Sequence, residues 1–167
     1  MRALLLAACL SIFATTAFAQ ELSLAGADGQ AVTLTRAEFA ALPRHSVVFE
    51  AHGTKGKFEG PLLIDILAKA GAPTGKQLHG AELTNAVLVI AADGYQVAFG
   101  LAEADPNTRA NKIIIADRMD GKPLGDDDGP YRLVVEGDLR PARSVRQVVG
   151  LRVVKLGAGM GDGHKPH

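Results

Sequence analysis

The sequence contains one cysteine and no tryptophan among its 167 residues. That cysteine, Cys9, falls inside a predicted secretion signal with a basic start at Arg2, an apolar run over residues 3–13 and small residues at 17 and 19. We predict that residues 1–19 form a cleavable signal peptide. The exported chain then has no thiol, which excludes disulfides and sites that need a cysteine ligand or nucleophile.

Other absences narrow the function further. No second unbroken apolar stretch of about 18 residues follows the signal, so we expect a periplasmic chain without membrane insertion. Loss of Arg2 with the signal leaves 17 basic against 18 acidic residues, a formal charge of −1, and aromatic residues make up only 5% of the chain. Because neither a global positive charge nor a broad stacking surface is available, we expect no nucleic-acid binding.

The length after the signal, about 147 residues, fits one domain. We place this domain at residues 20–156, followed by a glycine-rich tail at 157–167 whose lack of apolar periodicity predicts disorder. A competing interpretation, a lipoprotein cleavage box at residues 6–9, leaves an apolar run of about five residues, shorter than the usual run of about 7–15. We therefore favour the cleavable signal.

Period-two patterning and β-branched residues predict several strands. These lie at residues 31–34, 45–51, 87–92, 95–99, 112–116, 132–135 and 148–156. Asp93-Gly94 predicts a hairpin with a two-residue turn, and Asp120-Gly121 marks another turn. The glycine and lysine composition of residues 53–57 predicts a turn or loop.

Two short helices interrupt these strands. Thr35 and Glu38, three residues apart, form a capping-box signature for a helix that ends before Pro43. Pro61 at a first helical position begins the second helix, whose apolar residues recur every three or four positions until Gly71. Runs of strands with isolated helices predict an α+β fold with mixed or antiparallel sheets.

Short motifs follow one another in a fixed order over about residues 47–154. They are Phe58-x-Gly60-x-Leu62, Asp93-Gly94-Tyr95, Ile113-Ile114-Ile115-Ala116, Asp120-Gly121-x-Pro123-Leu124, Gly129-Pro130-x-Arg132-Leu133-Val134-Val135 and Ser144-Val145-Arg146. This order resembles the molybdopterin-binding domain of the sulfite oxidase family. The resemblance implies the family's α+β fold, with mixed and antiparallel sheets, a β-grasp-like part and a few short helices.

One expected residue of that family is missing. Its members bind molybdenum through a cysteine thiolate near the end of the strand before the Phe-x-Gly-x-Leu segment. Here that place is taken by Ala51 or His52, and an imidazole does not reproduce a soft anionic donor. The resemblance therefore implies a pterin or molybdopterin as cofactor, with no metal ligand assigned and enzyme activity left open. Short exported members without the cysteine resemble this chain most.

Basic and hydroxyl side chains gather at residues 140–146. A guanidinium is a planar fork of donors that suits phosphate or the oxo edge of a pterin, and a serine hydroxyl adds one more bond. In the family, the triplet that Ser144-Val145-Arg146 resembles lies beside the pterin. We predict that Arg143, Ser144 and Arg146 bind the ligand, and that Arg143→Ala abolishes binding with little change in stability.

Three further positions are candidates for ligand contact. His52, with Gly53, lies on the loop that replaces the cysteine loop, where an imidazole can hydrogen-bond or stack on a heterocycle. Asp117 ends a strand, where its carboxylate can pair with the amino-imino edge of a pterin. Arg132 is equally consistent with ligand contact and with the solvent face of a strand. We assign neither catalytic residues nor metal ligands, because no nucleophile or metalloprotease motif appears.

Three functions follow from these observations. The first is a noncatalytic exported domain that binds a pterin or molybdopterin-like molecule and signals its presence to a membrane-bound partner protein. The second is a molybdopterin-dependent oxidoreductase, or a subunit of one, that lacks the usual cysteine ligand. The third is a domain that keeps the fold only as an interaction surface and binds no ligand.

Overall fold

The computed structural model describes residues 21–51 and 54–157. In chain order the strands and α-helices are β1 (Leu22–Ala25), β2 (Ala31–Leu34), α1 (Arg36–Ala40), β3 (His45–Ala51), β4 (Thr54–Gly60), α2 (Leu63–Ala68), β5 (Asn85–Ala91), β6 (Gln96–Gly100), β7 (Ile113–Ala116), β8 (Arg118–Met119), β9 (Lys122–Pro123), β10 (Arg132–Val135) and β11 (Val148–Lys155). Four 3₁₀ turns complete this part of the chain: η1 (Gly75–Gln77), η2 (Gly80–Thr84), η3 (Leu101–Ala104) and η4 (Pro141–Arg143).

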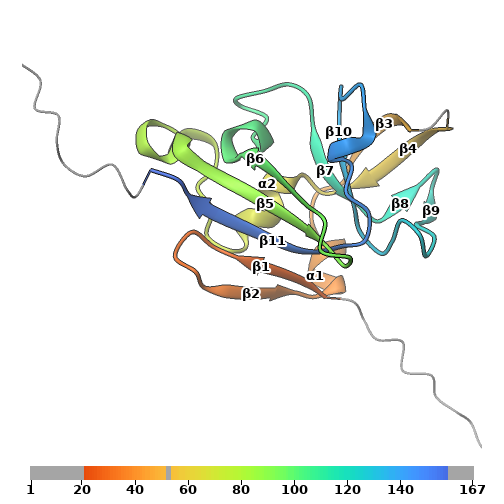
Figure 1. Cartoon of the computed structure of the whole chain (residues 1–167), viewed down its shortest axis with the longest axis horizontal. Coiled ribbons are helices and arrows are strands. Elements are labelled where there is room, and N and C mark those ends of the chain that lie inside the picture. Colours follow the sequence, from red (N-terminus) through yellow and green to blue (C-terminus); the bar gives the residue numbers. More distant parts are fainter. Residues whose placement is uncertain (1–20, 52–53, 158–167) are drawn as a thin grey trace, which may run out of the picture.

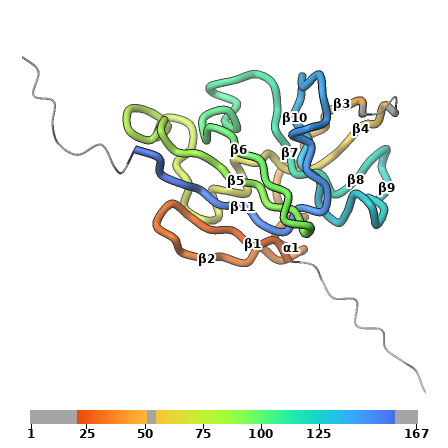
Figure 2. Tube along the Cα trace, in the orientation of Figure 1, coloured from red at the N-terminus to blue at the C-terminus, as the bar shows by residue number. Residues whose placement is uncertain are grey.

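The strands form three sheets. A five-stranded sheet has the order β2-β1-β11-β5-β6, in which β1 and β11 run parallel and the other neighbours antiparallel. A four-stranded antiparallel sheet, β3-β4-β8-β9, and a two-stranded antiparallel sheet, β10-β7, lie together at the other end of the molecule (Figure 1). The first and last strands of the described chain are therefore neighbours (Figure 2). The predicted α+β class with mixed and antiparallel sheets is confirmed.

Local sequence signals explain the two α-helices. The predicted capping box is present at α1, because the Thr35 hydroxyl accepts from the Glu38 N–H and the Glu38 carboxylate accepts from the Thr35 N–H. Helix α2 begins at Leu63 and not at Pro61, since Leu62 is held in an extended conformation by a bridge to Ile114. The buried face of α2 packs into one continuous apolar core with all four residues of β7. No helix in residues 21–51 and 54–157 is long and apolar enough to cross a membrane.

Two local predictions were wrong. Residues 54–57 are not part of a loop but the start of β4, which pairs with β3 as far as Ala51 opposite Thr54. Cross-strand pairing here overrides the turn-like composition. The β5–β6 hairpin does not close with two residues, because the Ala91 N–H donates to the Tyr95 carbonyl and only Gly94 has a positive φ (86°). The hairpin therefore has a three-residue loop with glycine in the left-handed position.

Close packing between β4 and β7 brings the smaller sheets together. The Ile115 N–H donates to the Pro61 carbonyl and the Asp117 N–H to the Glu59 carbonyl, at 3.0 and 3.1 Å. Gly60 lies between these bonds, and a Cβ there would overlap the carbonyl of Ile115. Glycine is required at this position because the two backbones approach so closely. This contact sets where the carboxyl end of β7, which carries Asp117, lies relative to the neighbouring loops.

Candidate functional site

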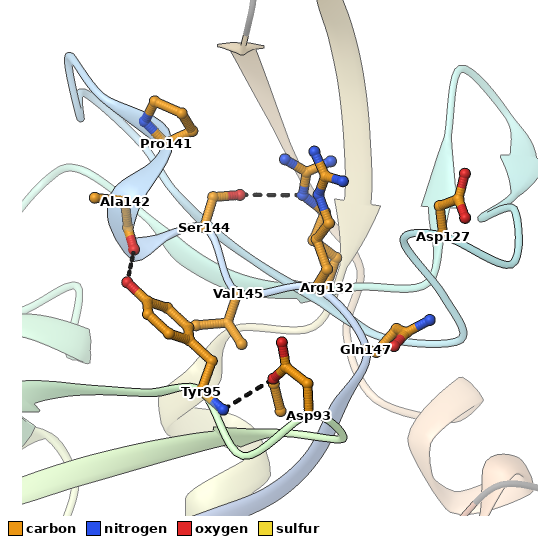
Figure 3. Close-up of a pocket in the computed structure, with 11 residues that line it drawn as sticks. Asp93, Tyr95, Asp127, Arg132, Pro141, Ala142, Ser144, Val145 and Gln147 are labelled. Carbon is orange, nitrogen blue, oxygen red and sulfur yellow. Dashed lines mark hydrogen bonds between the residues drawn. The ribbon is translucent and has the colours of Figure 1, made fainter.

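A cavity of about 500 Å³ lies between β10, the loop of the β5–β6 hairpin and the bend that leads into β11. Its polar lining includes Arg146. Arg132 and Ser144 line it as well (Figure 3). A second cavity, of about 430 Å³, contains Asp117 in its lining. Gln147 lines both cavities, so the two adjoin at this residue. Their sizes are in the range that holds small ligands and cofactors.

The bend is fixed against β10 by main-chain bonds on both sides of Arg146. The Leu133 N–H donates to the Val145 carbonyl, and the Val148 N–H donates to the Tyr131 carbonyl, each at 2.8 Å. Between these bonds Gln147 adopts a left-handed conformation with φ 48°, which is uncommon for a residue with a side chain. The bend thus has a defined path, and the side chains at 144 and 146 reach the cavity while that of Arg143 does not.

Arg132 is the buried cation of the site. Only 4% of the residue is exposed, and the other three residues of its strand are apolar and buried as well. Its Nε donates to Ser144 Oγ at 3.1 Å, its Nη1 donates to Asp128 Oδ1 at 3.0 Å, and its guanidinium lies 5.0 Å from the centre of the Phe58 ring. Burial lowers the pKa of Arg132, and the neighbouring Asp128 carboxylate opposes that shift.

Ser144 and Arg146 complete the polar wall. The Ser144 hydroxyl accepts from Arg132 (Figure 3). It also donates to the Leu133 carbonyl at 2.9 Å, and the two bonds together orient it. Arg146 Nε lies 3.1 Å from Asp128 Oδ1, the same oxygen that Arg132 uses. Two guanidinium groups therefore share one carboxylate, and the three groups together carry a formal charge of +1. The cavity lining also contains the carboxylates of Asp93 and Asp127, so its formal charges balance, and it is the guanidinium N–H groups left unused by Asp128 that are suited to an anionic ligand.

Arg143 lies outside both cavities. Its Nε and Nη2 donate to the two carboxylate oxygens of Asp138 at 2.9 and 2.6 Å, and its guanidinium stacks 4.8 Å from the centre of the Phe99 ring. Glu103 lies 3.7 Å from its Nη1. The hydrogen bond to Asp138 raises the pKa of Arg143 above its ordinary value. Ser144 and Arg146 therefore lie together at the cavity, whereas the guanidinium of Arg143 contacts other side chains of the protein.

The other predicted residues are dispersed. Asp117 lines the second cavity, where its Oδ1 pairs with the Arg44 guanidinium and its side chain is 20% exposed. His52 and Gly53 lie outside the described residues. In residues 21–51 and 54–157 no group of three or more His, Cys, Asp or Glu side chains is placed to hold a metal ion.

The sequence left the burial of Arg132 open, yet a signal for it was present. The four residues of β10 are all buried, and Leu133, Val134 and Val135 form an uninterrupted apolar run without period-two alternation. Such a run is typical of a strand that is covered on both faces, so its arginine is expected to be buried with a partner. No comparable signal predicts Asp128, because its neighbours Asp126 and Asp127 have the same side chain.

Comparisons with known proteins agree on the fold. A family model described as "oxidoreductase molybdopterin binding domain" matches residues 14–157. No curated protein matches the chain. Among solved structures, the crystal structure of the sulfane dehydrogenase SoxCD from Paracoccus pantotrophus matches with a TM-score of 0.63 and 16% identity. The match covers 81% of this chain and 38% of that chain, so this chain spans well under half the length of its structural neighbour. At this identity the likeness concerns the fold alone.

Proposed function

The chain belongs to the oxidoreductase molybdopterin binding domain family, and on that premise we propose that the cavity at Arg132, Ser144 and Arg146 binds the organic part of molybdopterin or a related pterin. Family membership confirms the resemblance found in the sequence. The observation that carries the proposal is the guanidinium of Arg146, which is half-exposed at a cavity of ligand size and pairs with Asp128 through Nε alone. The remaining N–H donors of such a guanidinium can bind the anionic phosphate end of a cofactor.

The donors present fit the organic part of the cofactor. Arg146 is half-exposed and uses its Nε for Asp128, so N–H groups of its fork remain for a phosphate or an oxo group. Ser144 is held in place by Arg132 and faces the same cavity. Asp117 lies in the adjoining cavity, where Arg44 pairs with its Oδ1. Its other carboxylate oxygen can accept from the amino-imino edge of a pterin. Each contact uses a group whose orientation is already set by the protein.

The residues do not offer the thiolate that the resemblance implies for the metal. The only cysteine of the sequence is Cys9, within the predicted signal peptide. When bound with its metal, molybdopterin supplies two-electron redox chemistry. The soft thiolate ligand that tunes such a metal would have to be replaced by another donor, and imidazole or carboxylate differs from it in softness and charge.

Two candidate roles remain, and different observations favour them. Family membership favours a molybdopterin-binding domain of an oxidoreductase, or a subunit of one, over the signalling role that the sequence put first. The absence of a thiol after residue 9 favours a noncatalytic pterin-binding domain. A membrane-bound partner to which it reports is part of that proposal. Export to the periplasm, the signal at residues 1–19, the domain at 20–156 and the tail at 157–167 stay part of the proposal.

The test is to analyse what the protein carries. The full chain is expressed in a molybdenum-replete host, purified natively and denatured, and the released material is measured by mass spectrometry together with elemental molybdenum. Molybdopterin with stoichiometric molybdenum supports the oxidoreductase role, and a pterin without molybdenum supports the noncatalytic role. A folded protein that releases no pterin and binds none when pterin is added contradicts the proposal and leaves the ligand-free interaction domain.

A further inference from the structure

Asp128 does not line the cavity, yet it contacts both guanidinium groups of the proposed anion site although it carries the same charge as the ligand. Its Oδ1 accepts from Arg132 Nη1 at 3.0 Å and lies 3.1 Å from Arg146 Nε. Its side chain is 24% exposed, so it is neither buried away from the cavity nor free in solvent. A ligand phosphate that approaches Arg146 therefore meets a carboxylate that already occupies one of the donors it needs.

The two guanidinium groups held by Asp128 differ in how firmly they are fixed. The side chain of Arg132 is 5% exposed and has three contacts, with Asp128, Ser144 and the Phe58 ring. The side chain of Arg146 is 50% exposed, and Asp128 is its one ion-pair partner among residues 21–51 and 54–157. An exposed pair of this kind is weak and can be exchanged, whereas a buried pair with further hydrogen bonds is not readily broken.

We infer that Asp128 is an internal counter-ion that holds Arg146 in the ligand-free protein and yields it to the anionic group of the ligand, while its bond to Arg132 is kept. The inference rests on the proposed function, because it assigns a role at the same cavity. It predicts that Asp128 limits affinity for phosphate-bearing ligands. Removing its charge then strengthens binding, which is the opposite of what loss of a contact residue does.

The neighbouring Asp127 provides a matched control. It lines the same cavity and carries the same charge, but in the described part of the chain it forms no ion pair with either guanidinium. Asp127→Asn therefore removes a nearby negative charge without releasing Arg146. A general electrostatic effect would appear in both variants, whereas the exchange of Arg146 between carboxylate and ligand would appear only in Asp128→Asn.

The experiment measures dissociation constants by calorimetry for two probes, a pterin carrying a phosphomonoester and the same pterin without phosphate. Asp128→Asn and Asp127→Asn are each made in the parent chain and in Arg146→Gln. We expect Asp128→Asn to bind the phosphate-bearing probe about five-fold more tightly than the parent, and Asp127→Asn to differ by less than about two-fold. The gain should be absent for the phosphate-free probe and absent in the Arg146→Gln background.

Several results would overturn the inference. Equal or weaker binding by Asp128→Asn, an equal gain in Asp127→Asn, or a gain that persists without Arg146 each contradicts the exchange. If Asp128→Asn does not fold because Arg132 needs the carboxylate, the exchange is tested by NMR on the parent protein. The ¹⁵Nε signal of Arg146 should then shift when the phosphate-bearing probe is added while that of Arg132 stays in place, and the converse contradicts the inference. If the parent binds neither probe, the proposed function itself fails.

Discussion

Arg143 and Arg146 lie three residues apart on the same bend, yet their surroundings differ in almost every respect. Arg143 has a bidentate carboxylate partner in Asp138, a second carboxylate in Glu103 and an aromatic ring beneath it. Arg146 has one shared carboxylate oxygen and is half-exposed at a cavity. The first guanidinium is satisfied by the protein, and the second has donors left for a ligand.

The difference shows that basic residues close together in sequence need not form one binding site. In this bend, η4 directs Arg143 toward η3 and β6. The residues that follow place Ser144 against Arg132 of β10 and Arg146 against Asp128. Arg143 therefore fastens the bend, while Arg146 serves the cavity that the bend encloses. Four substitutions test this division of roles.

The largest effect is expected at Arg132, the buried cation beneath the cavity. Arg132→Met removes the bonds to Asp128 and Ser144 and should lower the free energy of unfolding by about 3 kcal/mol, because breaking a buried pair leaves its partners uncompensated. Denaturant unfolding measures this change. The exposed strand residue Arg152 is the control, and Arg152→Met should change stability by less than about 0.5 kcal/mol. Equal effects of the two substitutions would show that Arg132 is not a buried anchor.

Ser144→Ala is expected to have the next largest effect. The substitution leaves the Arg132 Nε–H and the Leu133 carbonyl without the hydroxyl between them, which should reduce stability by about 2 kcal/mol. Thermal unfolding of Ser144→Ala is compared with that of Ser46→Ala, whose exposed hydroxyl has no hydrogen bond recorded in the described residues. A loss at Ser144 no greater than that at Ser46 argues against an ordered Arg132–Ser144 pair.

Arg146→Gln should act on binding and not on folding. Loss of the half-exposed guanidinium is expected to weaken binding of a phosphate-bearing pterin about ten-fold, and to change the free energy of unfolding by less than about 1 kcal/mol. Calorimetric titration and denaturant unfolding of the same preparation measure both quantities. A large loss of stability with unchanged affinity would show that Arg146 stabilises the bend and does not bind the ligand.

Arg143→Ala should have the smallest effect, and on stability alone. The side chain is 37% exposed, so its bonds to Asp138 and its contact with Phe99 are partly screened and contribute about 1 kcal/mol. The measurement is unfolding of Arg143→Ala beside the conservative Arg143→Lys, which keeps the charge but not the bidentate fork. If Arg143→Ala is as stable as the parent, the contacts of Arg143 do not hold the bend in place.

Much of this fold could be predicted from local signals. The capping box at Thr35, the apolar run of β7 and the Asp120-Gly121 turn each depend on neighbouring residues, and the structure contains all three. The start of β4 could not be predicted in this way, because Thr54 becomes a strand residue only through pairing with β3. Pairing partners distant in sequence decide such segments, and composition does not report them.

The site was predicted in part for the same reason. The resemblance of the triplet at 144–146 singled out Ser144 and Arg146, and both residues line the candidate cavity. The orientation of Arg143 depends on Asp138 and Phe99, and the left-handed conformation of Gln147 depends on how the bend meets β10. These are tertiary contacts, so the sequence could not separate the arginine with internal partners from the arginine that lines the cavity.

The most direct test of the account is to titrate one phosphate-bearing pterin into Arg143→Ala and Arg146→Gln side by side. The account predicts that Arg143→Ala keeps the parent affinity within about two-fold and that Arg146→Gln binds about ten-fold more weakly. The sequence alone predicts that Arg143→Ala abolishes binding. That loss, together with parent-like affinity in Arg146→Gln, would contradict the account.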